Sequence, residues 1–231
     1  MSKKYAYVTL ATTESFLKGA HLLAYSLYRV NSKFPLIIMV TENLKPLLED
    51  QYNYKIIPYY KLNNSENRTV DCLNKLQCLN FIEYDRLFFL DADIFVLKNL
   101  DYIFEEYNYD FFAGIKIMNG KKFLNGSKVL YTPKAGLFNS ILNNKQLMSY
   151  SNEEPILISL FKDFYDSFDE VSFNLEREDI IHFSGEKKYW EIFNFNFSYL
   201  DGLSLKEIGS CLNSLFDFVF IYFKYSTWKD E

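Results

Sequence analysis

The 231-residue sequence holds few of the residues that mark specialised folds, with three cysteines, two histidines, eight glycines and two tryptophans. Cys72, Cys78 and Cys211 form no CxxC pair, so they indicate neither a disulfide framework nor a zinc site and are expected to be reduced core thiols. The longest apolar stretch near the C-terminus, residues 215–223, contains Asp217 and is too short to cross about 30 Å of hydrocarbon. No signal peptide is visible, and we therefore expect a cytoplasmic protein without a membrane span.

An excess of positive charge is also lacking. The 25 basic residues are outnumbered by 30 acidic ones, which gives a formal net charge of −5 and a pI of about 5.2. A nucleic-acid binder normally carries a basic face, so no nucleic-acid partner is expected. The chain contains no GxxxxGK(S/T), GxGxxG or GxSxG motif, which removes the P-loop, dinucleotide-binding and hydrolase-elbow classes.

What the chain does contain is an alternation of short apolar runs with helical segments, in a composition (49% hydrophobic, 24% charged) typical of a globular domain. The runs are continuously apolar, which is typical of a parallel sheet covered by helices on both faces. The pattern predicts strands over residues 5–10, 35–40, 55–58, 85–90, 111–117, 129–131 and 180–183, and helices over 16–30, 44–52, 73–82, 99–106, 155–165 and 204–224. We expect one α/β domain over 1–231, with a C-terminal helical extension at about 203–226.

The first segment with chemical potential is Asp91-Ala92-Asp93, which follows a buried strand. Parallel α/β sheets place their ligands at this carboxyl edge. Carboxylates one residue apart in extended backbone point to the same side and can share one hard cation, such as Mn²⁺ or Mg²⁺. The competing interpretation is a solvated acidic turn.

Two further segments carry weaker signals. His182, Gly185 and Lys188 follow a late strand, where they offer a nitrogen ligand, a close backbone approach and a positive charge to a metal-bound diphosphate. Thr12 and Thr13 begin the first helix, where backbone amides and hydroxyls favour anions and polar bases. The competing interpretations are a hydrogen-bonded core histidine and an ordinary helix N-cap.

Four sequence blocks together resemble glycosyltransferase family 8, the family of glycogenin. The blocks are residues 7–19, 73–78, 89–97 and 182–190, in the order in which the family has them, and the resemblance covers about residues 5–191. It implies the GT-A fold, a Rossmann-like nucleotide-sugar transferase fold with a mostly parallel central sheet. It also implies a UDP-hexose donor, Mn²⁺ as cofactor and retention of the anomeric configuration.

The resemblance also implies roles for individual residues. The implied metal ligands are Asp91, Asp93 and His182. The implied donor-binding residues are Leu10, Thr12, Thr13 and Phe16 at the uridine, Gly185 and Lys188 at the diphosphate, and Arg68, Lys75 and Ala92 elsewhere along the donor. The residues expected to act on the reacting sugar and its leaving group are Asn125, Glu154 and Lys188.

The chain departs from the family pattern at several places, of which three concern the reacting sugar or the acceptor. The family's Asn-Ser/Ala-Gly appears here as Asn125-Gly126-Ser127, and its Asp-Gln pair aligns best with Glu154-Pro155. A glutamate is one methylene longer than an aspartate, so we expect the donor sugar to be seated differently. The interval between Phe173 and His182 is short and contains no tyrosine, although in glycogenin it carries the acceptor.

We therefore expect a retaining transferase that moves a hexose, glucose by preference, from a UDP-sugar to an acceptor hydroxyl. The acceptor stays open between a separate glycan or protein and the chain itself, for example at Tyr222 or Tyr225. The alternative is a catalytically impaired UDP-sugar-binding interaction module. The apolar run at 215–223, together with the resemblance, favours a homodimer.

Overall fold

The computed structural model describes residues 3–41, 44, 54–59, 73–107, 110–118, 121–150, 153–161 and 179–183. The chain divides into two compact units, Met1–Ile180 and Ile181–Glu231, and residues 181–183 are the described part of the second. The expected C-terminal helix at 203–226 and most of the expected helix at 44–52 lie outside the described residues. The single domain expected over 1–231 therefore stays a prediction.

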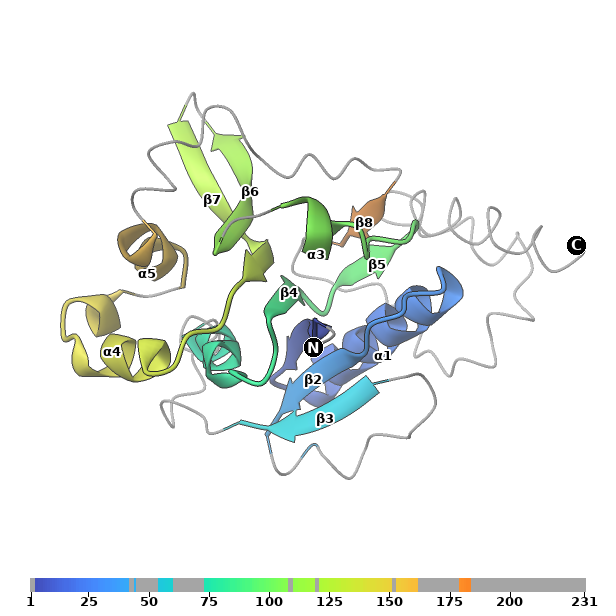
Figure 1. The fold of residues 1–231 in the computed structure, drawn as a ribbon, viewed down its shortest axis with the longest axis horizontal. Helices are drawn as coiled ribbons and strands as arrows, with labels where there is room; N and C mark the ends of the chain where they lie inside the picture. The colour runs from blue at the N-terminus through green and yellow to red at the C-terminus, as the bar shows by residue number, and fades with distance from the viewer. Residues whose placement is uncertain are drawn as a thin grey trace, which may run out of the picture. The chain divides into compact units, whose positions relative to one another are not determined.

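The first unit is built on a six-stranded sheet with the strand order β3-β2-β1-β4-β7-β6 (Figure 1). Its strands are β1 (Tyr5–Ala11), β2 (Leu36–Val40), β3 (Tyr54–Pro58), β4 (Arg86–Leu90), β6 (Phe111–Met118) and β7 (Lys121–Tyr131). The strands β3, β2, β1 and β4 run parallel, whereas β7 and β6 add an antiparallel pair beside β4. The predicted α/β architecture with a mostly parallel central sheet is confirmed.

Helices cover both faces of this sheet. Tyr5 and Tyr7 of β1 belong to the core beneath α1 (Glu14–Arg29) and α3 (Ile103–Glu106), whereas Ala6 and Val8 belong to the core on the other face. The second face is covered by the 3₁₀ helix η2 (Asn74–Asn80), α4 (Leu137–Asn143), the 3₁₀ turn η3 (Leu147–Ser149) and α5 (Glu153–Leu160). Every residue of β1 is buried, which explains why its sequence is continuously apolar rather than alternating.

The structure differs from the sequence-based elements in several places: α4 was not predicted, for example, and the helix expected over 99–106 is only α3. The three-residue strand β5 (Ile94–Val96), which pairs with β8 (Ile180–His182), was not predicted because such a short run carries no periodicity. The expected strand at 129–131 is only the end of β7. The earlier part of β7 was not predicted, because the polar segment Asn125-Gly126-Ser127 interrupts its pattern. The helix α5 begins at Glu153 rather than at Pro155, because a proline is tolerated in the first turn of a helix.

A bulge in β7 accounts for the interruption of its pattern. Ala113 of β6 pairs with Val129, but the next residue, Gly114, pairs with Asn125. Residues 126–128 therefore have no partner on β6, and such a bulge bends a strand and redirects its side chains. This bulge lies where β7 passes the end of β4, since Lys128 pairs with Leu90.

At the amino edge of the sheet, Asp101 joins β1 to the loop before β2. Its carboxylate accepts hydrogen bonds from the Tyr7 hydroxyl (2.9 Å), the Ser32 hydroxyl (2.8 Å), the Lys33 backbone N–H (2.9 Å) and the Asn99 side-chain amide (3.3 Å). Burial, together with the charge of Asp101, raises the pKa of Tyr7 well above its ordinary value, so the hydroxyl remains a donor. All the donors to this carboxylate that come from the described part of the chain are neutral.

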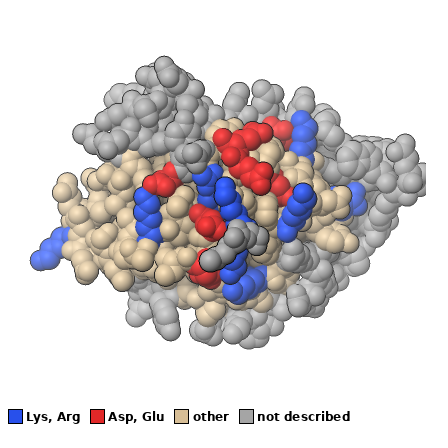
Figure 2. Space-filling view, viewed as in Figure 1, with Lys and Arg blue, Asp and Glu red and all other residues tan. Residues whose placement is uncertain are grey.

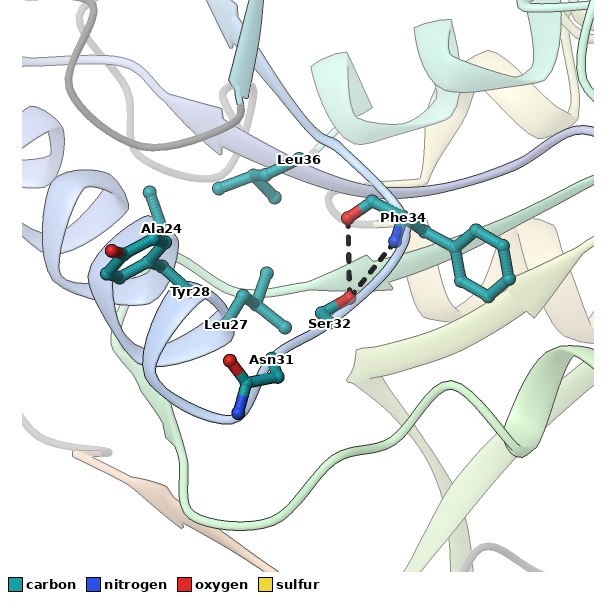
Figure 3. A pocket seen from close by; sticks show the side chains of 7 residues that line it. All are labelled: Ala24, Leu27, Tyr28, Asn31, Ser32, Phe34 and Leu36. Carbon is teal, nitrogen blue, oxygen red and sulfur yellow. Dashed lines mark hydrogen bonds between the residues drawn. The ribbon is translucent and has the colours of Figure 1, made fainter.

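A hollow of about 300 Å³ lies beside this network, where α1 ends and the chain turns into β2 (Figure 3). It is lined by Ala24, Leu27, Tyr28, Asn31, Ser32, Phe34 and Leu36. Because β2 runs parallel to β1 and β4, the start of β2 lies at the opposite edge from Asp91, which follows the end of β4. The hollow is therefore separate from the edge at which a ligand is expected.

The described surface carries intermixed charges. Figure 2 shows Lys and Arg side chains lying among Asp and Glu side chains on one face. None of the described helices is long and apolar enough to cross a membrane. Cys78 is a buried free thiol, and burial raises its pKa, whereas Cys72 and Cys211 lie outside the described residues.

Candidate active site at the carboxyl edge of the sheet

Asp91 directly follows β4, at the carboxyl end of the parallel strands. Its backbone N–H donates to the carbonyl oxygen of Ser127 (2.9 Å), and the N–H of Ile94 donates back to the carbonyl oxygen of Asp91 (3.1 Å). The chain therefore turns tightly between β4 and β5, with Asp91 half-buried and Asp93 only 5% exposed. A buried carboxylate needs a charged or hydrogen-bonding partner, which argues against a merely solvated acidic turn.

A nitrogen that could bind a metal beside these carboxylates comes from His182, the last residue of β8. Strand β8 pairs with β5, which follows the Asp91–Asp93 turn. Asp91, Asp93 and His182 each offer one ligand atom, and these atoms lie within 4.8 Å of one another. Two carboxylates and an imidazole are a donor set that suits Mn²⁺ and also accommodates Mg²⁺.

Lys75 of η2 forms an ion pair with two carboxylates at this edge. Its Nζ lies 2.8 Å from Oδ1 of Asp91 and 2.8 Å from Oε1 of Glu153, and it also lies over the ring of Phe89, 5.5 Å from the centroid. Burial favours the neutral amine, but the charges of Asp91 and Glu153 outweigh it and raise the pKa of Lys75 above its ordinary value. Lys75 is therefore an ammonium ion between two carboxylates.

Gly126 in the β7 bulge leaves room for the start of α5. A Cβ on Gly126 would lie 2.7 Å from Oε1 of Glu153 and 3.3 Å from Cγ of Glu154. The backbone N–H of Gly126 donates to Oε1 of Glu154 (3.2 Å). The position of glycine in Asn125-Gly126-Ser127 thus has a physical reason, because the two glutamates occupy the space a side chain would need.

Asn125 is oriented by its neighbour in the same bulge. Its Oδ1 accepts hydrogen bonds from the hydroxyl (2.6 Å) and the backbone N–H (3.1 Å) of Ser127. The carbonyl of Ser127 in turn accepts from the N–H of Asp91. The bulge therefore links Asn125 to the Asp91 turn through Ser127.

The residues expected at the uridine lie at the end of β1. Thr13 is the N-cap of α1, and its Oγ1 accepts from the N–H of Phe16 (3.2 Å), as the competing N-cap interpretation required. Thr12 and Phe16 are half-buried, whereas Leu10 is packed in the core beneath η2. Ala92 is also buried. The remaining expected donor-binding residues, Arg68, Gly185 and Lys188, lie outside the described residues.

Glu153 is the residue that the sequence reasoning missed. The alignment singled out Glu154, yet the side chain on Lys75 belongs to Glu153 and is only 5% exposed. Two adjacent glutamates cannot be told apart by residue type. They differ only in the direction in which each side chain points from the helix. Ile156 and Leu157 are buried, and in a helix that begins at Glu153 they follow Glu153 by three and four residues. This spacing places Glu153 on the buried face of the helix, and it is the signal in the sequence that could have identified Glu153.

Comparisons with known proteins agree with this geometry. No family model matches the chain. It is 36% identical over 112 residues to the uncharacterized protein R707 of Acanthamoeba polyphaga mimivirus (44% of this chain, 40% of that protein). It is 36% identical over 122 residues to galactinol synthase 3 of Arabidopsis thaliana (48% and 36%). Human glycogenin-2 is 23% identical over 98% of this chain and 50% of its own length. The chain therefore spans half or less of these relatives.

Solved structures show the same fold. The glycosyltransferase GlyE of Streptococcus pneumoniae TIGR4 superposes with a TM-score of 0.57 at 16% identity, covering 83% of this chain and 57% of that one. The galactosyltransferase LgtC superposes with a TM-score of 0.56 at 15% identity, covering 80% and 89%. The predicted resemblance to glycosyltransferase family 8 is confirmed: the chain is similar in sequence to galactinol synthases and glycogenins, and it has the GT-A fold.

Proposed function

We propose that the chain is a retaining, Mn²⁺-dependent glycosyltransferase that moves a hexose from a UDP-sugar, glucose by preference, to an acceptor hydroxyl. The observation that carries this proposal is the group of Asp91, Asp93 and His182, whose ligand atoms lie within 4.8 Å of one another at the carboxyl edge. Mg²⁺ is the alternative ion for the same donor set. Such an ion supplies a Lewis acid for the departing diphosphate.

The chain's own residues support the two ends of the donor. Thr12, Thr13 and Phe16, with Leu10 behind them, are proposed to line the uridine at the end of β1. Arg68, Gly185 and Lys188 are proposed from the family resemblance to contact the donor, with Lys188 and the backbone at Gly185 balancing the charge that develops on the diphosphate.

The hexose end of the donor is proposed to face the β7 bulge and the start of α5. Asn125 is oriented by Ser127, and Glu154 is held by the N–H of Gly126, so both side chains are fixed beside the Asp91 turn. Preorganised polar groups of this kind stabilise a transition state without reorganising at the moment of reaction. We therefore propose Asn125 and Glu154 as the residues that act on the sugar.

The same hydrogen bonds also favour the second candidate, a UDP-sugar-binding module without transfer activity. An acceptor atom that is already engaged with the protein has less capacity for a substrate hydroxyl, and this holds for Oδ1 of Asn125 and Oε1 of Glu154. The two candidates share the donor site and differ only in whether the glycosidic bond to UDP is cleaved.

The experiment is a panel of UDP-sugars incubated with the full chain and Mn²⁺, with UDP release as the readout. A transferase releases UDP from at least one sugar, through acceptor transfer or slow hydrolysis. A binding module is protected by UDP against thermal unfolding but releases none. The Asp93→Asn variant serves as control, and release that is equal in wild type and variant contradicts the proposed site.

The acceptor is proposed to be either a separate glycan or protein hydroxyl, or the chain itself. Intact-mass measurement after incubation with UDP-glucose and Mn²⁺ separates these, because self-transfer adds whole hexose units that map to a peptide. An unchanged mass alongside rapid transfer to an added sugar assigns a separate acceptor. Light scattering at micromolar concentration tests the proposed homodimer, which a monomer mass contradicts.

A further inference from the structure

Lys75, which the family resemblance proposes to lie along the donor, also contacts the candidate metal site directly. It forms two contacts of equal length, to Asp91 and to Glu153, but the two carboxylates differ in environment. The side chain of Asp91 is 25% exposed and faces the proposed metal site, whereas that of Glu153 is 5% exposed and lies at the start of α5. A fixed positive charge is thus shared between a candidate metal ligand and a buried anion.

Electrostatics gives this arrangement a consequence for any second cation. A lysine ammonium that contacts Asp91 repels an ion bound to the same carboxylate and takes up part of its negative charge. Glu153 acts in the opposite direction, because it neutralises Lys75 and draws the ammonium away from Asp91. The negative charge available to a metal at Asp91 therefore depends on how strongly the Lys75 ammonium interacts with Glu153 rather than with Asp91.

The position of Glu153 is fixed by the β7 bulge. Its Oε1 fills the space where Gly126 lacks a side chain, at 2.7 Å from the position of a Cβ. An alanine there would push the carboxylate off Lys75, since its neighbours on α5 are in the core. Gly126 therefore allows Glu153 to reach the ammonium.

We propose that Lys75 and Glu153 are positioning residues that set the metal affinity of the Asp91 site, Lys75 by lowering it and Glu153 by raising it. This inference rests on the proposed metal site at Asp91, Asp93 and His182. It differs from a merely structural role in one respect: the two residues, although paired with each other, have effects of opposite sign.

The test is titration of the full chain with Mn²⁺ alone, with free Mn²⁺ followed by electron paramagnetic resonance. Lys75→Met keeps the apolar stem and removes the charge, and we expect Mn²⁺ to bind about tenfold more tightly. Glu153→Gln removes one of the two carboxylates on Lys75 and leaves Asp91. We therefore expect Mn²⁺ to bind about threefold more weakly. Gly126→Ala should weaken binding in the same direction as Glu153→Gln.

The double variant Lys75→Met with Glu153→Gln keeps the net charge of the wild type and avoids leaving a buried glutamate without its cation. It should bind Mn²⁺ within about twofold of the wild type. If Lys75→Met alone fails to fold, by circular dichroism, the double variant compared with Glu153→Gln isolates the same effect of Lys75. The exposed pair Lys134 and Asp110 supplies matched controls, Lys134→Met and Asp110→Asn, which should leave the affinity unchanged.

The outcomes separate this inference from the proposed function. Opposite shifts in the two single variants support it. Equal affinities, or weaker binding in both, overturn it while leaving the metal site intact. Wild-type binding that is absent, or that persists unchanged in Asp93→Asn, overturns the metal site and this inference together.

Discussion

The carboxylates at the two edges of the parallel sheet have different kinds of partner. At the amino edge, Asp101 accepts hydrogen bonds from neutral donors on Tyr7, Ser32, Lys33 and Asn99. At the carboxyl edge, Asp91 and Glu153 share one ammonium and Asp93 is buried beside them. A structural carboxylate is saturated by its neighbours, whereas a group of carboxylates held close together stores negative charge that a cation can relieve. The second arrangement is typical of functional sites.

The largest expected effect comes from removing one charge at the carboxyl edge. Asp93→Asn keeps the size of the side chain but deprives a bound ion of an anionic ligand. We expect sugar transfer to fall by roughly 100-fold or more, because several kcal/mol of charge stabilisation are lost. The measurement is UDP release with Mn²⁺, and circular dichroism is the control for folding. Full activity in Asp93→Asn would contradict the claim that the carboxyl edge, unlike the amino edge, binds a metal needed for the reaction.

A smaller effect on the reaction is expected at the hexose end. Glu154→Ala removes the carboxylate that accepts from the N–H of Gly126. We expect turnover to fall by roughly tenfold or more, because one preorganised group near the sugar is lost. Mn²⁺ affinity should stay close to that of the wild type. Loss of metal binding instead would place Glu154 among the residues that build the metal site.

At the amino edge the expected effect is on stability alone. Asp101→Ala leaves the buried hydroxyl of Tyr7 without its acceptor, and we expect a loss of about 2 kcal/mol in the free energy of unfolding. Urea denaturation measures this loss. Mn²⁺ affinity should not change, because Asp101 lies at the opposite edge; a large change in affinity would show that the two edges are coupled.

The smallest effect is expected for an exposed ion pair. Lys134 and Asp110 form a salt bridge in which both side chains are more than half exposed, at 54% and 58%. Lys134→Met should change the free energy of unfolding by less than about 0.5 kcal/mol, because solvent screens such pairs. Urea denaturation checks this value. A change as large as that of Asp101→Ala would contradict the claim that the exposure of an ion pair determines how much it contributes to stability.

The local part of this architecture could be predicted from the sequence. The buried strands β1 and β4 are continuous apolar runs, and the Asp91–Asp93 pair that follows β4 could therefore be assigned to the carboxyl edge. The family blocks then supplied the GT-A fold, which the comparisons bear out. In these segments the information lies within a few consecutive residues.

The parts that escaped prediction depend on contacts between distant segments. A strand at 180–183 and the grouping of His182 with Asp91 and Asp93 were expected, but β5 and its pairing with β8 were not, because a strand of three residues leaves no pattern. The bulge in β7 is set by its pairing with β6 and has a polar sequence that looks like a loop. Glu153 was passed over in favour of Glu154, because their difference lies in the direction each faces once α5 has formed.

The most direct test of the central claim is the metal dependence of UDP release. The full chain, treated with EDTA and then desalted, is incubated with the UDP-sugar that proved best in the panel, before and after addition of Mn²⁺. The carboxyl edge as described predicts no release without metal, recovery on adding Mn²⁺, and no recovery in Asp93→Asn. Undiminished release in EDTA would contradict the claim that Asp91, Asp93 and His182 form a working metal site.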